Sequence, residues 1–277
     1  MKKSVLKTMS LFCMIFTLLF TALPVQAMEL SDVQTQAAAA VKKGWVKEKA
    51  GYCYYENGKK VTNKLKKIGK YYYYLGANGV RKTGWYTVKM TVNKKTVYRT
   101  FYFNTKGAST GKYTTADSTM MKKLDQAIVK NKIAPSKLTT TSQKKAAIKK
   151  LYDYTVKTYK YKRVMGFKAT KGWQYDFAKQ MLVQGAGSCY HDAAVFGALV
   201  KRATGLPVRV CYGTANGVLN KGRSQAHGWV EVKLGNTWYI YDTNAGRFSN
   251  VTKNWYFKKA SAMTKYYKAT EKTDVEL

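Results

Sequence analysis

Cysteine and histidine are scarce in this chain, which has four cysteines and two histidines in 277 residues. Cys13 lies in the apolar N-terminal segment, so the rest of the chain keeps Cys53, Cys189 and Cys211. An odd, widely spaced set argues against a disulfide framework, although one pair, Cys53 with Cys211, stays open. No H-x-x-H or C-x-x-C spacing occurs, which argues against a structural zinc site.

Acidic residues are also few, with 14 aspartates and glutamates against 50 lysines and arginines and a net charge of +36. Only seven of the basic residues are arginines, the side chain best suited to reading bases and phosphates. The lysine excess therefore argues against sequence-specific binding of nucleic acid and favours anionic surface polymers as partners. The alternative is a solvated basic surface with no dedicated partner. No acidic cluster suggests calcium, and we expect no bound metal or cofactor.

Long apolar runs are absent except at the N-terminus. Lys2, Lys3 and Lys7 precede the apolar segment 11–23, and Ala27 ends a small-residue cleavage site. This pattern predicts a secretory signal peptide over residues 1–27. The run is shorter than the ~20 residues that a membrane span requires. We expect an exported, soluble protein with no stable membrane span.

Residues 44–113 carry a degenerate period of twenty residues. Gly44–Trp45 and Gly84–Trp85 lie forty positions apart, and Lys64–Leu65 stands at the midpoint. Each unit continues into an aromatic run and a glycine turn: Tyr52–Tyr55 to Asn57–Gly58, Tyr71–Tyr74 to Asn78–Gly79, and Phe101–Phe103 to Lys106–Gly107. Aromatic strands interrupted by such turns predict β-hairpins. A short fixed period predicts that the hairpins stack on one another.

This first part resembles the cell-wall-binding repeats, of the choline-binding and glucan-binding type, on exported proteins of Gram-positive bacteria. The resemblance implies a repeat module over residues 28–113 whose aromatic side chains bind a cell-wall polymer or surface carbohydrate. It also implies a secreted, wall-associated location. Lys64–Leu65 removes one expected wall of a choline cage, so the ligand stays open. The alternative is that the aromatic residues only pack the hairpins.

Helical patterns begin after the repeats. Met121, Leu124 and Ile128 follow a helical spacing within a connector over residues 114–141. A second helix is predicted from Ser142, and a third over residues 175–184.

A longer helix is predicted from its N-cap Ser188 to Thr204, with Gly205 after its end. Cys189 would stand in its first turn, where free N–H groups and the helix dipole stabilise a thiolate. Gly185 and Gly187 are expected to leave room for a substrate backbone. The alternative interpretation is that Cys189 is a small buried apolar residue.

His227 is the better candidate for a base. His191 lies about 200° around the helix from Cys189, so we expect it to be a polar residue on the helix side. Gly235–Asn236 predicts a hairpin turn that pairs Leu234 with Thr237, Trp229 with Asp242, and His227 with Asn244. His227 and Asp242 then become diagonal neighbours on one sheet face, and the carboxylate can orient the imidazole.

The motifs of the second half come in the order Gly185-x-Gly187-x-Cys189-x-x-x-Ala193, Gly205–Val210, His227–Val230 and Trp238-Tyr239-x-Tyr241-Asp242. In this order they resemble the transglutaminase-like superfamily. The resemblance implies an α+β fold: a papain-like transglutaminase core over residues 142–277, with the nucleophile helix packed on an antiparallel sheet. It also implies the catalytic triad Cys189, His227 and Asp242.

These residues predict a secreted thiol enzyme, a cysteine protease or amidase that cleaves peptide or isopeptide bonds through an acyl-enzyme. The same triad would serve a transglutaminase-type cross-linker, and a non-catalytic wall-binding protein is the alternative from another class. Oxyanion stabilisation needs fixed N–H donors. The Cys189 amide is one candidate, and Gln184 and Trp173 are the side-chain candidates.

Overall fold

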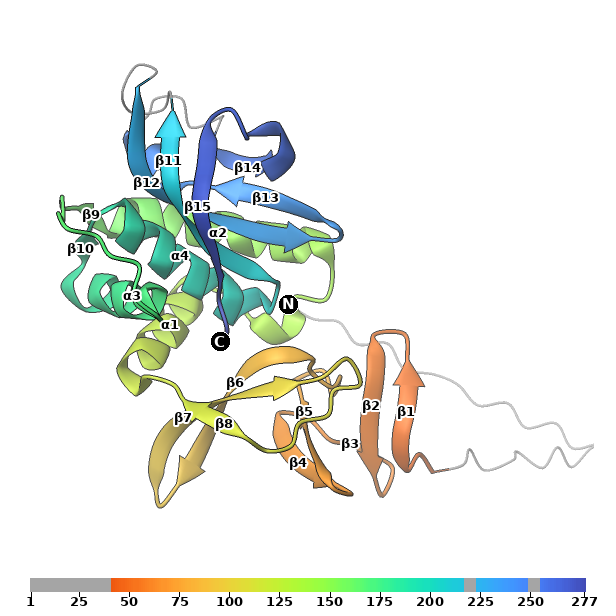
Figure 1. Cartoon of the computed structure of the whole chain (residues 1–277). Coiled ribbons are helices and arrows are strands. Elements are labelled where there is room, and N and C mark those ends of the chain that lie inside the picture. The colour runs from red at the N-terminus through yellow and green to blue at the C-terminus, as the bar shows by residue number, and fades with distance from the viewer. Residues whose placement is uncertain (1–40, 217–222, 249–254) are drawn as a thin grey trace, which may run out of the picture. The chain divides into compact units, whose positions relative to one another are not determined.

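The computed structural model describes residues 41–216, 223–248 and 255–277 (Figure 1). The signal peptide predicted over residues 1–27 and the start of the predicted repeat module lie outside these ranges. No helix in the part of the chain that the structure describes is long and apolar enough to cross a membrane.

The first third of the described chain is built from antiparallel hairpins. Its strands are β1 (Gly44–Glu48), β2 (Gly51–Glu56), β3 (Lys59–Lys60), β4 (Lys64–Ile68), β5 (Tyr71–Leu75), β6 (Gly84–Val92), β7 (Lys95–Phe103) and β8 (Tyr113–Thr115). Strand β1 pairs with β2, β4 with β5, and β6 with β7. The predicted β-hairpins are present, although these three pairs reverse before each aromatic run; the predicted turn at Asn57–Gly58 joins β2 to β3.

Turn chemistry explains where these hairpins reverse. Asn93 and Lys94, between β6 and β7, both adopt positive φ, as a two-residue hairpin turn of type I′ requires, and so do Asn57 and Gly58 between β2 and β3. Backbone hydrogen bonds also join successive units, from Arg81 N–H to the Tyr52 carbonyl and from Tyr72 N–H to the Ser109 carbonyl. Each unit is therefore tied to its neighbour, as the short period predicts.

Three helices follow, close to their predicted positions. They are α1 (Ser118–Lys130), α2 (Thr141–Thr158) and α3 (Trp173–Gln184), with the short helix η1 (Pro135–Lys137) before α2. Asp117 caps α1 by accepting from the Met120 amide, and Thr140 forms a capping box with Gln143 at the start of α2. Met121 and Leu124 of α1 are fully buried, so its apolar stripe serves the core.

Helix α4 (Cys189–Thr204) is the central helix of the second half. Its N-cap is Ser188, and Gly205 ends it in the left-handed conformation, as predicted. Thirteen of its sixteen residues are buried. At Gly197 the helix lies so close to the sheet that an added Cβ would sit 2.9 Å from a Val210 methyl group. A larger residue there would push the helix off the strands.

The sheet under α4 has five antiparallel strands in the order β14-β13-β12-β11-β15 (Figure 1). The strands are β11 (Val208–Asn216), β12 (Ser224–Leu234), β13 (Thr237–Tyr241), β14 (Tyr256–Lys259) and β15 (Tyr267–Asp274). The short helices α5 (Thr243–Phe248) and η3 (Ala260–Ala262) connect its later strands. Val210 and Val230 pack with α4, whereas Cys211 and Trp229 pack on the other face, so both faces are covered. The predicted α+β class is confirmed.

Contacts link the hairpins to the helices. Ala116 N–H donates to the Tyr98 carbonyl, and the Tyr98 hydroxyl donates to Asp125 of α1 at 3.2 Å. Arg202 of α4 donates to the Thr87 carbonyl of β6 at 2.8 Å and pairs with Asp125. The domain boundaries at residues 113/114 and 141/142 stay predictions.

Candidate active site

Cys189 opens helix α4 at the edge of a cleft of about 360 Å³. The thiol-bearing residue is 8% exposed, so it is buried but borders open space. The cleft is lined by residues of β9, α4, β12 and α5: Tyr161, Cys189, Gln225, Ala226, His227, Asn244 and Phe248. The structure thus brings the predicted nucleophile and the predicted base into one cleft.

Gly228 allows the start of α4 to meet strand β12. A Cβ at Gly228 would lie 3.2 Å from the Tyr190 Cα atom and 3.4 Å from the Cys189 carbonyl oxygen. Only a residue without a side chain fits this contact. The approach places the helix start beside His227, the residue before Gly228.

His227 and Asp242 form a buried pair, with 2.7 Å between Nε2 and Oδ2 and exposed fractions of 2% and 1%. Burial by itself would lower the pKa of His227. The Asp242 charge and hydrogen bond, together with the Cys189 side chain, outweigh it and raise that pKa to about 10. Because Nε2 bonds to Asp242, Nδ1 is the ring nitrogen left for the thiol. The arrangement favours an imidazolium next to Cys189 at neutral pH.

The route by which Asp242 reaches His227 differs from the predicted one. The register from Leu234–Thr237 to Val230–Tyr241 is as predicted, but strand β13 ends at Tyr241. Asp242 donates its amide to the Trp255 carbonyl, and α5 begins at Thr243. The predicted pairs Trp229–Asp242 and His227–Asn244 are therefore wrong, since the chain turns into a helix instead of continuing the ladder.

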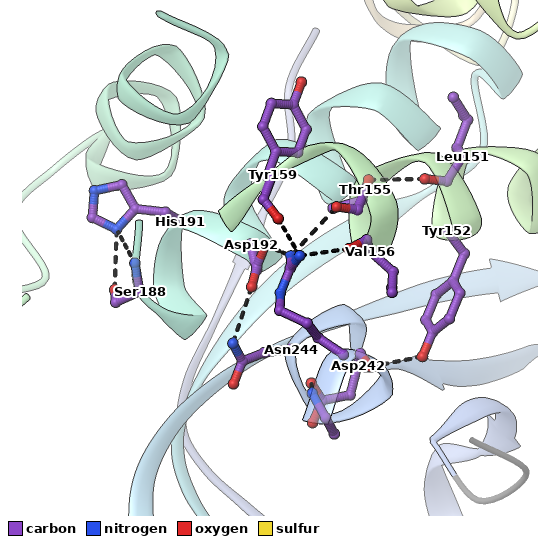
Figure 2. Close-up of polar contacts among 12 residues, drawn as sticks. Leu151, Tyr152, Thr155, Val156, Tyr159, Ser188, His191, Asp192, Asp242 and Asn244 are labelled. Atoms are coloured by element: carbon purple, nitrogen blue, oxygen red, sulfur yellow. Dashed lines mark hydrogen bonds and ion pairs between the residues drawn. The ribbon is translucent and has the colours of Figure 1, made fainter. Parts of the chain in front are cut away.

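Asp242 is held by groups that no sequence pattern marked. Its Oδ1 accepts from the Ala245 amide at 2.8 Å, and its Oδ2 accepts from the Tyr267 hydroxyl at 2.7 Å. Its backbone carbonyl accepts from Tyr152 of α2 at 2.9 Å (Figure 2). These hydrogen bonds hold Oδ2 toward His227 and Oδ1 toward the start of α5.

His191, expected as a polar residue on the helix side, is buried between α4 and α3. It is 3% exposed, and its ring stacks on Phe177 at 4.2 Å between centroids. Its Nδ1 accepts from the Ser188 amide at 3.2 Å (Figure 2), and its Nε2 lies 2.9 Å from Gln180 Oε1. Burial lowers the pKa of His191 to about 4, so it is neutral at pH 7. Its role is to cap α4, because both ring nitrogens are engaged.

The two glycines before Cys189 also have structural roles. A Cβ at Gly187 would overlap the His191 ring, so Gly187 makes room for the capping histidine. Gly185 ends α3 in the left-handed conformation at φ +74°. Neither lines the cleft, so the expectation that they leave space for substrate is wrong.

The side-chain candidates for the oxyanion lie elsewhere. Trp173 and Gln184 line a different pocket from the one that holds Cys189. Tyr161 does line the cleft, and burial and the Cys189 charge raise its pKa. It arrives because strand β9 (Lys160–Tyr161) pairs in parallel with β10 (Ala186–Gly187), just before Cys189. Sequence reasoning missed Tyr161, since two-residue strands leave no periodic signal.

A buried network ties α5 to the two long helices. Asp192 of α4 is fully buried and accepts from Asn244 at 3.0 Å (Figure 2). It also pairs with Arg247 at 2.7 Å. Arg247 also donates to the carbonyls of Val156 and Tyr159 at the end of α2. These carbonyls lack partners within their own helix, so Arg247 completes the helix end. The network holds the segment that carries Asp242 and Asn244 against the cleft.

The three cysteines of the described chain are free. Cys53 and Cys211 are fully buried, and burial raises the pKa of each thiol. The pairing of Cys53 with Cys211 that the sequence left open is not formed. No group of three histidine, cysteine, aspartate or glutamate side chains gathers within the described residues to hold a metal ion.

Comparison with known proteins agrees with this geometry. The family model described as the transglutaminase-like superfamily matches residues 131–243. These residues form a transglutaminase-like domain. The match contains Cys189, His227 and Asp242 and begins within the segment predicted as a connector. The fold and the family together support a thiol enzyme at the level of the superfamily. No curated protein matches the chain.

Solved structures with similarity to the chain include a candidate cysteine protease from Cytophaga hutchinsonii, 17% identical with a TM-score of 0.34 over 56% of this chain and 50% of that one. The periplasmic domain of TgpA from Pseudomonas aeruginosa is 22% identical, with a TM-score of 0.31, and the match covers 44% of this chain and 41% of that one. A TGase is 13% identical, with a TM-score of 0.32, and the match covers 56% of this chain and 37% of that one. The chain spans half or less of the length of each.

Proposed function

We propose that this protein is an exported, cell-surface-associated cysteine peptidase or amidase that cleaves peptide or isopeptide bonds. The observation that carries the proposal is the cleft in which Cys189 meets the buried His227–Asp242 pair. Cys189 stands at the start of α4 beside the protonated ring of His227, so the nucleophile and its acid–base partner share one cleft.

The mechanism follows from this geometry. The Cys189 thiolate attacks the substrate carbonyl, and His227 Nδ1 gives its proton to the leaving amine. Asp242 keeps the ring oriented through Nε2. The Cys189 amide and the Tyr161 hydroxyl are the donors that we assign to the oxyanion. Water then attacks the acyl-enzyme, with His227 as base, and releases the acid and the free thiol.

Hydrolysis is favoured over cross-linking by the chemistry of the cleft. None of the described residues that line it is acidic. A lysine acceptor would bring an ammonium group into a strongly basic protein without a carboxylate to receive it. A transglutaminase-type reaction on the same triad is the alternative outcome of the test below.

Surface association is proposed for the hairpins. A pocket of about 320 Å³ is lined by the aromatic side chains Trp85, Tyr102 and Tyr113. Tyr102 is half exposed, and its ring lies 5.2 Å from that of Trp85. Exposed aromatic rings of this kind suit the flat faces of sugars, which supports a wall carbohydrate as the partner.

Four variants test the triad. We expect Cys189→Ala and His227→Ala to abolish turnover in folded protein, because one removes the nucleophile and the other its base. Asp242→Asn should retain more activity, since an amide can still hold the ring. His191→Ala should leave catalysis nearly unchanged while lowering the melting temperature, because it caps α4. Activity in folded Cys189→Ala, or loss in His191→Ala alone, would contradict the assignment.

Product analysis tests the reaction. Mature protein is incubated in H₂¹⁸O with cell-wall peptides, and separately with a glutamine peptide and a labelled primary amine. Hydrolysis adds ¹⁸O to a new carboxyl group, whereas cross-linking adds the amine, and mass spectrometry distinguishes the two. A thiol probe that labels Cys189 no faster than the buried Cys53 and Cys211 would count against any thiol mechanism.

A further inference from the structure

A second and larger groove lies apart from the cleft at Cys189. Its volume is about 680 Å³. It is bounded by the turn between β1 and β2, the connection from β5 into β6, η1 and the segment after it, the start of α2 and the last turn of α4. It shares no lining residue with the catalytic cleft.

The walls of this groove are cationic. Five basic residues line it, and none of its described lining residues is acidic: Lys49, Arg81, Lys82, Lys144 and Arg202. Arg202 is ion-paired with Asp125 at 2.8 Å. The other four make no ion pair with any residue in the described ranges, and Arg81 rests on the Tyr52 ring at 4.4 Å. The groove therefore holds positive charge that the protein leaves unbalanced.

Lys82 is the groove residue on which the repulsion between neighbouring positive charges acts. It is only partly exposed, and burial and the charge of Lys144 lower its pKa. Two lysines of different elements thus repel each other across the groove. A bound anion would relieve this repulsion, whereas a cation or a neutral group would not.

The hairpin region around the groove carries the same sign of charge. Residues 41–116 contain sixteen lysines and two arginines against two glutamates. Both glutamates are already paired, Glu48 with Lys60 at 2.6 Å and Glu56 with Lys66 at 2.7 Å. No carboxylate of this region is left to compete with a ligand for its lysines.

Aromatic rings stand beside the charges. Trp85 and Tyr86 both line the groove, and the Lys82 ammonium lies 5.3 Å from the centre of the Tyr86 ring. Aromatic rings beside lysines suit a ligand that carries both a sugar ring, which can stack on an aromatic ring, and an anionic group, which can pair with a lysine. Lysines offer point charges, which suit a repeating anion better than base-specific contacts.

We propose that this groove binds an anionic glycan, with phosphate or carboxylate groups on Lys82 and Lys144 and a sugar ring against Trp85. The site is separate from catalysis and does not depend on the catalytic proposal. It also assigns the surface attachment a ligand of definite charge.

The test uses the mature protein carrying Cys189→Ala, so that no polymer is processed. Affinity is measured by calorimetry for poly(ribitol phosphate), for polygalacturonate and for neutral dextran. We expect one or both anionic polymers to bind, which identifies phosphate or carboxylate as the source, and dextran not to bind. Lys82→Gln with Lys144→Gln should weaken binding by about tenfold or more, since two charge contacts are lost.

The matched control removes the same charge elsewhere. Lys122 and Lys150 are exposed and lie outside the groove, so Lys122→Gln with Lys150→Gln should change affinity less than about twofold. Equal loss in both double variants, no loss in either, or equal binding of neutral dextran would overturn the site. Binding of single-stranded DNA as tight as that of the polymers would overturn the glycan assignment.

A measurement without mutation covers the case in which the groove variant does not fold. Lysine acylation of the unmutated groove is followed by mass spectrometry with and without the anionic polymer. Bound polymer should slow the modification of Lys82 and Lys144 relative to Lys122 and Lys150. Equal rates at all four lysines would contradict the proposal.

Discussion

Tyr267 shows how a residue far along the chain can govern the site. Its hydroxyl donates to the same Asp242 oxygen that bonds to His227, and its ring packs on Trp229 at 4.9 Å. A carboxylate that accepts from two fixed donors keeps one orientation. In the proposed mechanism, the hydroxyl would act through Asp242, without touching the reacting atoms.

We expect Tyr267→Phe to lower kcat by about tenfold or more while KM changes little, because a hydrogen bond to a charged group contributes about 1.5–3 kcal/mol. Steady-state kinetics on a soluble peptide measure the effect. Tyr266→Phe is the control, since Tyr266 is the preceding residue, is half-buried, and makes no hydrogen bond to Asp242. A similar fall in both variants would mean that the hydroxyl of Tyr267 has no specific role.

The raised pKa of His227 predicts a pH dependence of stability. The protonated ring is favoured in the folded state, where its pKa is about 10, over the unfolded state, where it is about 6.5. This contribution is fully present below pH ~6.5 and is lost as the pH rises toward the folded value. Urea unfolding measures the difference in the free energy of unfolding between the wild type and His227→Gln. This difference should be smaller at about pH 9.5 than at about pH 6. A difference in the free energy of unfolding that does not change with pH would contradict a charged His227–Asp242 pair in the folded protein.

At the scale of elements, the cleft depends on a short helix that Arg247 ties to two longer ones. Helix α5 has six residues, too few to be stable alone, and it follows Asp242 directly. Arg247 fastens it to α2 and α4 through backbone carbonyls and Asp192. The position of the cleft wall is thus set by packing between elements.

Arg247→Met should destabilise the fold by about 3–5 kcal/mol, because it leaves the Asp192 carboxylate buried without its partner. Lys149→Met is the matched control, since its ion pair with Asp153 on α2 is exposed and worth under about 1 kcal/mol. Urea denaturation measures both. Equal small losses would show that the buried pair does not hold α5.

At the scale of the whole molecule, the charge of +36 complicates any test of surface binding. Basic proteins adsorb to anionic walls without a site, and salt weakens such adsorption. Contacts of aromatic rings with sugars persist when salt screens the charges. Retention on walls at two salt concentrations therefore separates the two contributions.

Tyr102→Ala should reduce sedimentation of the mature protein with cell walls severalfold at about 0.5 M salt, because charge is screened and the ring at the aromatic pocket is lost. Tyr71→Ala is the control, since Tyr71 is an exposed tyrosine of the same hairpin region outside that pocket. Wall binding that disappears with salt in the unmutated protein would assign retention to lysine charge alone.

Local features of the chain were predictable from sequence. Ser188 and Gly205 bound helix α4 where capping chemistry places them, and Gly235–Asn236 sets the register of β12 on β13. These features depend on residues a few positions apart, whose preferences act before the chain folds. The candidate site residues Cys189, His227 and Asp242 were found for the same reason, from the patterns immediately around them.

Contacts between distant segments were decided only by the tertiary structure. Tyr161 enters the cleft through a two-residue strand, and Tyr267 reaches Asp242 across 25 positions. His191 was expected only as a polar residue on the helix side, and Phe177 and Gln180 of α3 decide its burial and its hydrogen bonds. Sequence by itself determined the helices, the hairpins and the order of the site residues. Burial, the orientation of Asp242 and the cationic groove depend on which surfaces meet, because packing energy is shared among segments that no local pattern connects.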